Sequence, residues 1–248
     1  MLRLLTLLYL FYAAPLFAAE ALVAAATNFD AALEALAEQY EAATGHHIKH
    51  TSGSTGLLFA QIMNGAPYDI LLAADQERPR RLADAGVGIA ASRFTYARGR
   101  LALILARPEL VRADLQQTLL QADVRKLAIA NPALAPYGVA ANEVLSALDA
   151  RESLSGKIVM GENVGQAYAL VVTGNADAGI VALSLLLSRE RPGRKDFVEI
   201  PASLHAPIRQ DAILLARAAG NAAARDFLEF LQSNAALQRI GAFGYGVN

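Results

Sequence analysis

Apolar runs of strand length alternate with segments of helical period along most of the chain. The apolar run 21–26 precedes 30–44, in which Leu33, Leu36 and Tyr40 recur with the spacing of one helix face. The same alternation predicts further strands at 48–51, 68–73, 100–106, 126–130, 157–160, 179–183, 197–200 and 212–216. It predicts further helices at 57–63, 77–85, 138–148, 166–172, 222–231 and 235–240.

Strands and helices that alternate at this spacing are typical of βαβ units. We therefore expect an α/β fold with mainly parallel sheets and helices on both faces of each sheet. The segments most like linkers lie near 96–99 and 201–207. We predict two lobes, one made of 20–97 together with 208–248 and the other made of 98–207.

The first 19 residues have a different pattern. Arg3 precedes the apolar run 4–14, and the small residues Ala18 and Ala19 follow, which is the layout of a secretory signal peptide. The apolar run is short for a membrane-spanning helix, and the chain has no Cys to serve as a lipid attachment site. We predict a cleavable signal peptide over 1–19 and an exported mature protein, with an uncleaved anchor as the alternative.

The composition narrows the range of functions. The absence of Cys excludes disulfides, thiol catalysis and cysteine metal sites. Removal of Arg3 with the signal peptide leaves 21 basic and 23 acidic residues. This nearly neutral balance argues against a nucleic-acid partner, because binding a phosphate backbone needs clustered basic residues.

The first of four strand-to-helix junctions carries Thr27 and Asn28. Ligands of open α/β sheets bind where strands end and helices begin, and helix N-termini favour anions. The hydroxyl of Thr27 and the side-chain amide of Asn28 are candidate donors to such an anion. Thr27 is also a natural N-cap, with Asp30 at the capping-box position, so a purely structural cap is the alternative.

The second junction places the hydroxyls of Ser54 and Thr55 between Gly53 and Gly56, at the start of a predicted helix. Glycines let the backbone approach a small anion closely, and the hydroxyls can donate hydrogen bonds. The segment is not a P-loop, because Leu57 stands where that motif has Lys. A flexible turn with a cap is the alternative interpretation.

The third and fourth junctions lie in the second half of the chain. Tyr137 follows Pro136 at the start of a predicted helix, where it offers its main-chain N–H and its hydroxyl. Val164 offers its main-chain N–H at the next helix start. With two junctions from each half, a ligand clamped between two lobes becomes the favoured arrangement.

With these junctions, the chain resembles the molybdate-binding proteins of ABC transporters, which have the two-lobed type II periplasmic binding protein fold with the ligand in the interlobe cleft. The markers of this resemblance lie at 24–29, 52–56, 61–69, 73–75, 130–132 and 161–164. The most specific marker is the run Asn-Gly-Ala-Pro-Tyr-Asp at 64–69. The resemblance covers essentially the whole predicted mature chain.

The resemblance implies a set of anion ligands. Hydroxyl ligands would fall on Thr27 and on Thr55, with Ser54 adjacent, and main-chain donors on Tyr137 and Val164. Many members of the family have a Tyr ligand in the strand near 179–183, where this chain has Ala182. The chain is similar to the subgroup with Thr-Asn at the first junction, in which Asn28 and Tyr137 would complete the contacts.

The function implied by the resemblance is capture of molybdate or tungstate in the periplasm and delivery to the permease of an ABC importer. We expect a monomer without a cofactor, which binds molybdenum or tungsten only as the oxyanion. Molybdate and tungstate are fully deprotonated near neutral pH, so a site made only of hydrogen-bond donors suits them. Phosphate often carries a proton and gains from an acceptor, whereas sulfate has the same charge and must be excluded by size.

Two alternatives remain. The first is a binding protein for sulfate, phosphate or another small anion. The second is a hydrolase with Ser54 as nucleophile and a base among His46, His47, His50 and His205. The chain lacks a Gly-x-Ser-x-Gly elbow around Ser54, and the first three histidines are expected to be solvated. We therefore expect a protein that is not an enzyme.

Overall fold

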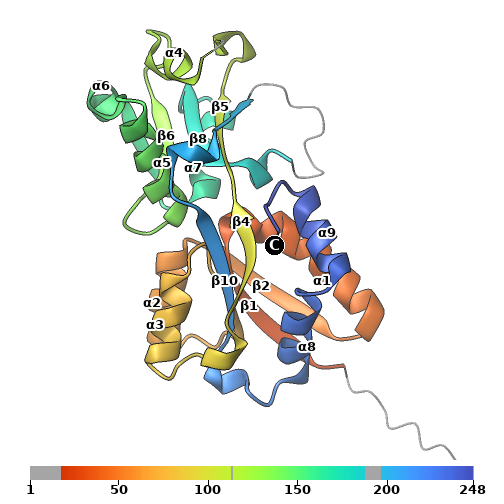
Figure 1. The fold of residues 1–248 in the computed structure, drawn as a ribbon. Coiled ribbons are helices and arrows are strands. Elements are labelled where there is room, and N and C mark those ends of the chain that lie inside the picture. The colour runs from red at the N-terminus through yellow and green to blue at the C-terminus, as the bar shows by residue number, and fades with distance from the viewer. Residues whose placement is uncertain (1–17, 113, 188–196, 248) are drawn as a thin grey trace, which may run out of the picture.

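The computed structural model describes residues 18–112, 114–187 and 197–247. Within these ranges, two five-stranded sheets flanked by helices form two lobes, which lie one above the other in Figure 1. We call the lobe that contains the first strand lobe 1 and the other lobe 2. All of the predicted signal peptide except Ala18 and Ala19 lies outside the described residues.

The sheet of lobe 1 has the strand order β2-β1-β3-β10-β4. Its strands are β1 (Glu20–Ala26), β2 (His47–Gly53), β3 (Ile70–Leu72), β4 (Phe94–Gly99) and β10 (Ile208–Leu214). The first three of these strands run parallel, whereas β10 runs antiparallel to both β3 and β4. The helices that cover this sheet are α1 (Asp30–Thr44), α2 (Thr55–Met63), α3 (Glu77–Asp84), α8 (Ala222–Phe230) and α9 (Asn234–Ala242).

The sheet of lobe 2 repeats this plan with the order β7-β6-β8-β5-β9. Its strands are β5 (Leu101–Leu105), β6 (Leu127–Ala130), β7 (Ile158–Gly161), β8 (Ala178–Ala182) and β9 (Phe197–Glu199). Its helices are α4 (Leu115–Leu120), α5 (Pro136–Ala147), α6 (Arg151–Leu154) and α7 (Val164–Val172). Here β6 runs parallel to β7 and β8, and β5 runs antiparallel to β8 and β9.

Short 3-10 helices connect these elements. They are η1 (Thr27–Phe29), η2 (Ala90–Ser92), η3 (Pro108–Leu110), η4 (Ser155–Lys157), η5 (Leu183–Leu185), η6 (Ala202–Leu204) and η7 (Ala216–Ala218). Two of them, η1 and η5, follow the carboxyl ends of β1 and β8 and contact each other across the lobes.

Two crossings join the lobes near the middle of the molecule (Figure 1). The chain passes from β4 through Arg100 into β5, and it returns from β9 through 200–207 into β10. The strand that enters each lobe begins at the cleft, whereas the strands of the βαβ units end there. This strand is β10 in lobe 1 and β5 in lobe 2. It runs antiparallel to the other four strands of its sheet, so each sheet is mixed, with four strands in one direction.

The two-lobed α/β prediction is confirmed, with a few elements different from the predicted ones. β4 replaces the linker predicted near 96–99, because Tyr96 and Ala97 are buried in the sheet and the strand pairs with β10. β10 begins at Ile208, earlier than the strand predicted at 212–216. The short helices α4 and α6 are not predicted from the sequence pattern.

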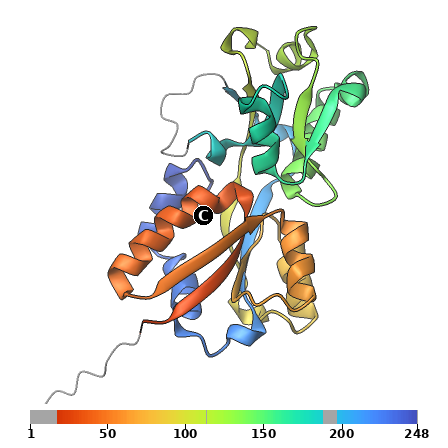
Figure 2. The ribbon, with the colours of Figure 1, turned by 180° about the vertical axis from the view of Figure 1, so that it is seen from behind.

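The core of lobe 1 is built from its own sheet and helices. In lobe 1, α1, α8 and α9 pack on one face of the sheet, and α2 and α3 pack on the other (Figure 1). Seen from behind in Figure 2, β2 forms one edge of this sheet beside α1. Within the described ranges, no helix has both the length and the apolar character needed to cross a bilayer.

Candidate functional site

A small cavity lies between the lobes and is lined by all six residues that the sequence predicts as ligands. Its lining residues are Ala26, Thr27, Asn28, Gly53, Ser54, Thr55, Ala74, Ala135, Pro136, Tyr137, Asn163 and Val164. The first seven belong to lobe 1 and the last five to lobe 2. Its volume of about 10 Å³ is comparable to the roughly 10–15 Å³ that one water needs. The cavity is therefore small, and groups from both lobes surround it.

Four helical segments begin at this cavity. They are η1 at Thr27, α2 at Thr55, α5 at Pro136 and α7 at Val164. The first N–H groups of a helix have no partner within the helix, and the aligned peptide dipoles make this end positive. The carboxyl ends of β1, β2, β6 and β7 bring these helix starts together from both lobes.

Two hydroxyl oxygens at the cavity are buried without a hydrogen-bond partner. Among the described residues, three buried side-chain polar atoms have no partner, and two of them are Thr27 Oγ1 and Ser54 Oγ. Leaving such a group unpaired costs about 1–3 kcal/mol. Two unpaired hydroxyls in one cavity indicate that a hydrogen-bonding ligand belongs there.

The capping interpretation of Thr27 is wrong. Ala26 occupies the N-cap of η1 and Phe29 that of α1, and neither helix start receives a side-chain cap. The hydroxyl of Thr27 makes no hydrogen bond with the main chain of either helix, so it does not act as a cap.

The two hydroxyls of the second junction differ in their partners. Ser54 is the N-cap residue of α2, yet its side chain makes no capping bond. The Oγ1 of Thr55 instead accepts a hydrogen bond of 3.1 Å from the main-chain N–H of Ala74, which follows β3. Thr55 therefore has a role within lobe 1, whereas the hydroxyl of Ser54 has no partner in the protein.

The side-chain amide of Asn28 is used inside the protein, contrary to its predicted part as a free donor. Its Nδ2 donates to Gln210 Oε1 at 2.8 Å and to Tyr245 Oη at 3.0 Å. Both N–H bonds of the amide thus have protein acceptors. The main-chain N–H of Asn28, in the first turn of η1, is the donor that remains on this residue.

The hydroxyl of Tyr137 also faces the protein interior. It accepts a hydrogen bond of 3.0 Å from Gln210 Nε2, and Gln210 Oε1 accepts another from Tyr96 Oη at 3.0 Å. Burial raises the pKa of Tyr96, Tyr137 and Tyr245, so these phenols stay neutral. At the cavity, Tyr137 therefore offers the main-chain N–H of the first turn of α5.

Gln210 and Tyr245 hold Asn28 in place at the site, and the sequence analysis did not predict either residue. Gln210 lies on β10 and Tyr245 lies near the C-terminus, far along the chain from the junctions they support. Tyr245 Oη donates to the main-chain carbonyl of Asn28 at 2.5 Å and contacts Ser184 Oγ of η5 at 3.0 Å. No local pattern marks either residue, because each acts through contacts that only the folded chain creates.

The lining of the cavity is uncharged. None of its twelve residues is Asp, Glu, Lys, Arg or His. The side-chain oxygen of Asn163 caps α7 by accepting from Gln166 N at 2.9 Å, so this acceptor has a donor within its own helix. The site can therefore meet a negative charge with neutral N–H and O–H dipoles.

The histidines of the hydrolase alternative lie elsewhere in the fold. His46 is buried, contrary to its predicted solvation, because it accepts a hydrogen bond of 3.1 Å from Ala19 N and packs near Tyr40. His50 lies 3.2 Å from the carboxylate of Asp30. In the described part of the chain, no group of three or more His, Asp or Glu residues is arranged to hold a metal ion.

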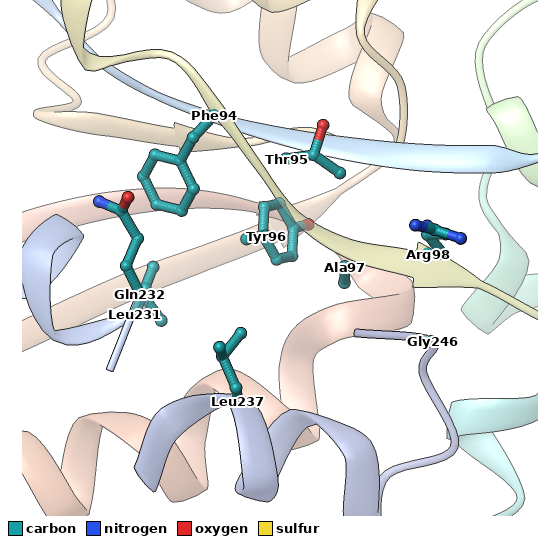
Figure 3. Close-up of a pocket in the computed structure, with 9 residues that line it drawn as sticks. All are labelled: Phe94, Thr95, Tyr96, Ala97, Arg98, Leu231, Gln232, Leu237 and Gly246. Carbon is teal, nitrogen blue, oxygen red and sulfur yellow. The ribbon is translucent and has the colours of Figure 1, made fainter. Parts of the chain in front are cut away.

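A second cavity of about 150 Å³ lies between β4 and the α8–α9 region (Figure 3). Its lining is mostly apolar, with Phe94, Tyr96 and Leu237 around it. None of the predicted ligand residues contributes to this cavity, and neither of the two unpaired hydroxyls lies in it. The small interlobe cavity is the candidate binding site, because both unpaired hydroxyls and all six predicted ligand residues line it.

Comparison with known proteins identifies the family. Residues 21–246 match the family of bacterial extracellular solute-binding proteins. The molybdate-binding protein ModA of Azotobacter vinelandii is 42% identical over 231 residues, which cover 93% of this chain and 91% of that protein. ModA of Rhodobacter capsulatus is 39% identical over 233 residues, which cover 94% of this chain and 90% of that protein.

A solved structure agrees with this result. The periplasmic molybdate-binding protein of Azotobacter vinelandii superposes on this chain with a TM-score of 0.87 at 38% identity. The match covers 92% of this chain and 99% of that one, so it includes both lobes. The chain belongs to the family of bacterial extracellular solute-binding proteins, and within that family it is similar to the periplasmic molybdate-binding proteins along nearly its whole length.

Proposed function

We propose that this protein captures molybdate or tungstate in the periplasm and delivers it to the permease of an ABC importer. The observation that carries the proposal is the pair of unpaired hydroxyls, Thr27 Oγ1 and Ser54 Oγ, in one uncharged cavity between the lobes. The relatives named as molybdate-binding proteins support the choice of anion. A cleavable signal peptide over 1–19 would direct the chain to the periplasm.

A deprotonated dianion fits the chemistry of the lining. Each helix N-terminus contributes roughly half a positive charge, so α2, α5 and α7 together offset a large part of a double negative charge. Hydrogen bonds to a charged oxygen contribute about 1.5–3 kcal/mol each. The lining has no carboxylate to accept a proton, so it favours an anion that carries none.

We assign the donors as follows. The side-chain hydroxyls would be those of Thr27 and Ser54, because neither has another partner. Thr55, whose hydroxyl holds Ala74 N, would act chiefly through the start of α2. The main-chain N–H groups would be those of Asn28, Tyr137 and Val164.

Capture would couple to closure of the two lobes. The lobes that we propose are 20–97 with 208–248, and 98–207, and each contributes two of the four junctions. An anion that bridges both lobes binds the closed form more tightly than the open form and so favours closure. The permease would then recognise the closed monomer, and no cofactor is needed for this cycle.

Calorimetry on the mature protein with molybdate, tungstate, sulfate and phosphate tests the proposal. We expect dissociation constants for molybdate and tungstate in the nanomolar to micromolar range, about −12 to −8 kcal/mol. Tight binding of phosphate or sulfate with no response to molybdate would overturn the assignment.

Sulfate is the second candidate, because the uncharged, donor-rich lining fits any deprotonated dianion. Phosphate is disfavoured, since its remaining proton would find no free carboxylate in the lining. The anion panel separates the two candidates by size, because molybdate is larger than sulfate and both carry the same charge.

A further inference from the structure

Two glycines lie where the lobes meet, each next in sequence to a residue that lines the cavity. Gly56 is in the first turn of α2 of lobe 1, and Gly165 is in the first turn of α7 of lobe 2. Neither has a positive φ, so the backbone itself does not require glycine at either position. A reason for glycine must therefore come from the neighbouring atoms.

Gly56 touches the main chain of the opposite lobe. Its N–H donates a hydrogen bond of 2.8 Å to the carbonyl of Leu134, in the loop between β6 and α5. A Cβ on Gly56 would lie 2.8 Å from that oxygen and 3.1 Å from Leu134 Cα. Main-chain atoms cannot rotate away as a flexible side chain can, so a larger residue would push the lobes apart.

Gly165 makes the corresponding contact from the other lobe. A Cβ there would lie 2.5 Å from Thr27 Cγ2 and 3.2 Å from Asn163 Oδ1. Thr27 is β-branched, with a stiff first side-chain torsion, and its hydroxyl is one of the proposed ligands. Moving the methyl group aside would also move that hydroxyl, so separation of the lobes is the easier response.

We propose that Gly56 and Gly165 are specificity-determining residues that set how closely the lobes approach and thereby the size of anion that fits. Because glycine has no side chain beyond a hydrogen atom, the lobes can close until Gly56 contacts the main chain of Leu134 and Gly165 contacts the methyl group of Thr27. A smaller anion cannot draw them closer, so its oxygens reach the donors of one lobe but lie far from those of the other. This inference rests on the proposed function, because it assumes a tetrahedral oxyanion held by both lobes.

An added methyl group shifts this closing distance outward. An anion that contacts both lobes of the wild-type protein then becomes too small to span them and loses contacts with one lobe. An anion that is already too small has fewer contacts to lose. The expected signature is therefore a change in the ratio of affinities for large and small anions, which a simple loss of folded protein does not produce.

The test uses Gly56→Ala and Gly165→Ala, with Gly241→Ala in α9 as the matched control, because a Cβ on Gly241 meets no atom within 4 Å. Calorimetry measures the dissociation constants for molybdate and sulfate, and thermal unfolding without anion checks the fold. We expect molybdate binding to weaken about tenfold or more in each of the first two variants. Sulfate binding should weaken less, and Gly241→Ala should match the wild type.

The inference is overturned if both variants bind molybdate as the wild type does, or if both anions weaken by the same factor. If the wild-type protein binds none of the oxyanions, the proposed function is contradicted. This result is known before any variant is compared. A wild-type protein that prefers sulfate would also contradict that function. In that case, sulfate should be the anion that loses more affinity in the two variants.

Discussion

Thr27 and Ser54 each carry a hydroxyl at the start of a helical segment, a position where such groups usually cap the helix. In this fold neither hydroxyl caps, and both oxygens are buried beside the same cavity without a partner. A buried donor without an acceptor destabilises the folded chain, whereas a bound anion supplies the acceptor. At this scale, binding and stability therefore make opposite demands on the same atoms.

Replacing Thr27 with Val removes the hydroxyl and keeps the shape of the side chain. We expect molybdate binding to weaken by about 1–3 kcal/mol, or roughly five- to 150-fold, while the thermal midpoint of the anion-free protein is unchanged or higher. Calorimetry and thermal unfolding measure the two effects. Thr44→Val is the control, because the Thr44 hydroxyl donates to Tyr40 O outside the site. Equal affinity for wild type and Thr27→Val would remove Thr27 from the ligand set.

Ser54 and Thr55 are distinguished by paired substitutions. Ser54→Ala should weaken anion binding at little cost in stability, because its hydroxyl has no protein partner. Thr55→Val should lower the thermal midpoint of the anion-free protein, because Ala74 N loses its buried acceptor. The same two measurements apply to both variants. A drop in stability with Ser54→Ala and not with Thr55→Val would reverse the roles assigned here.

At the scale of elements, side chains tie the first two junctions together. Asp30, the first residue of α1, lies 3.2 Å from His50 of β2 and accepts a hydrogen bond from Ser52 Oγ. The hydrogen bond to His50 lowers the pKa of Asp30, and the same bond raises the pKa of His50. The pair connects the segment after β1 to the strand that leads into α2, so it supports both lobe 1 junctions.

The pair predicts a pH dependence of stability. The raised pKa of His50 contributes stability that is present below its ordinary value of 6.5 and lost as pH rises through the raised value. The lowered pKa of Asp30 contributes stability that is present above 3.8 and lost as pH falls through the lowered value. The difference in thermal midpoint between wild type and His50→Gln should therefore be largest between these two ordinary values and shrink as the pH rises through the raised pKa of His50. A difference that stays constant as the pH rises from below 6.5 through the alkaline range would show that the ion pair contributes nothing.

At the scale of the whole molecule, a buried polar network connects the lobes behind the cavity. Asn28, Gln210 and Tyr245 of lobe 1 meet Tyr137 and Ser184 of lobe 2 through hydrogen bonds. All five are buried, so each polar atom depends on the others for its partner. The network holds η1, which carries Thr27, against the opposite lobe.

Tyr245→Phe tests this support, because it removes one hydroxyl and keeps the ring that packs edge-on against Phe29. Asn28 would lose both of its hydrogen bonds to Tyr245, so we expect weaker molybdate binding. Tyr40→Phe is the control, since it also removes a buried hydroxyl, bonded to Ala223 O away from the site. Both variants should have a lower thermal midpoint. Calorimetry should show weaker molybdate binding for Tyr245→Phe only. Similar affinity in the two variants would limit Tyr245 to a structural role.

Local pattern predicted some features well and others poorly, for identifiable reasons. Helix α1 lies at 30–44, as its apolar period predicts, and it ends at Gly45 with a left-handed φ of 73°. β4 was not predictable in the same way, because it ends in Arg98 and Gly99, its apolar stretch is short, and pairing with β10 stabilises it. The six candidate ligand residues could be located because each stands at a strand-to-helix junction. Their individual roles could not, since these depend on distant partners.

The sequence by itself determined the alternation of strands and helices and the four junctions with their donors, because these properties depend on neighbouring residues. Tertiary structure alone decided which groups remain available at the cavity. Gln210 and Tyr245 engage the amide of Asn28 from 182 and 217 residues away, and Ala74 engages the hydroxyl of Thr55. The contact of Gly165 with Thr27 likewise exists only when the lobes meet. A hydrogen bond or a steric contact requires atoms within a few ångströms, and only the folded chain brings such distant residues that close.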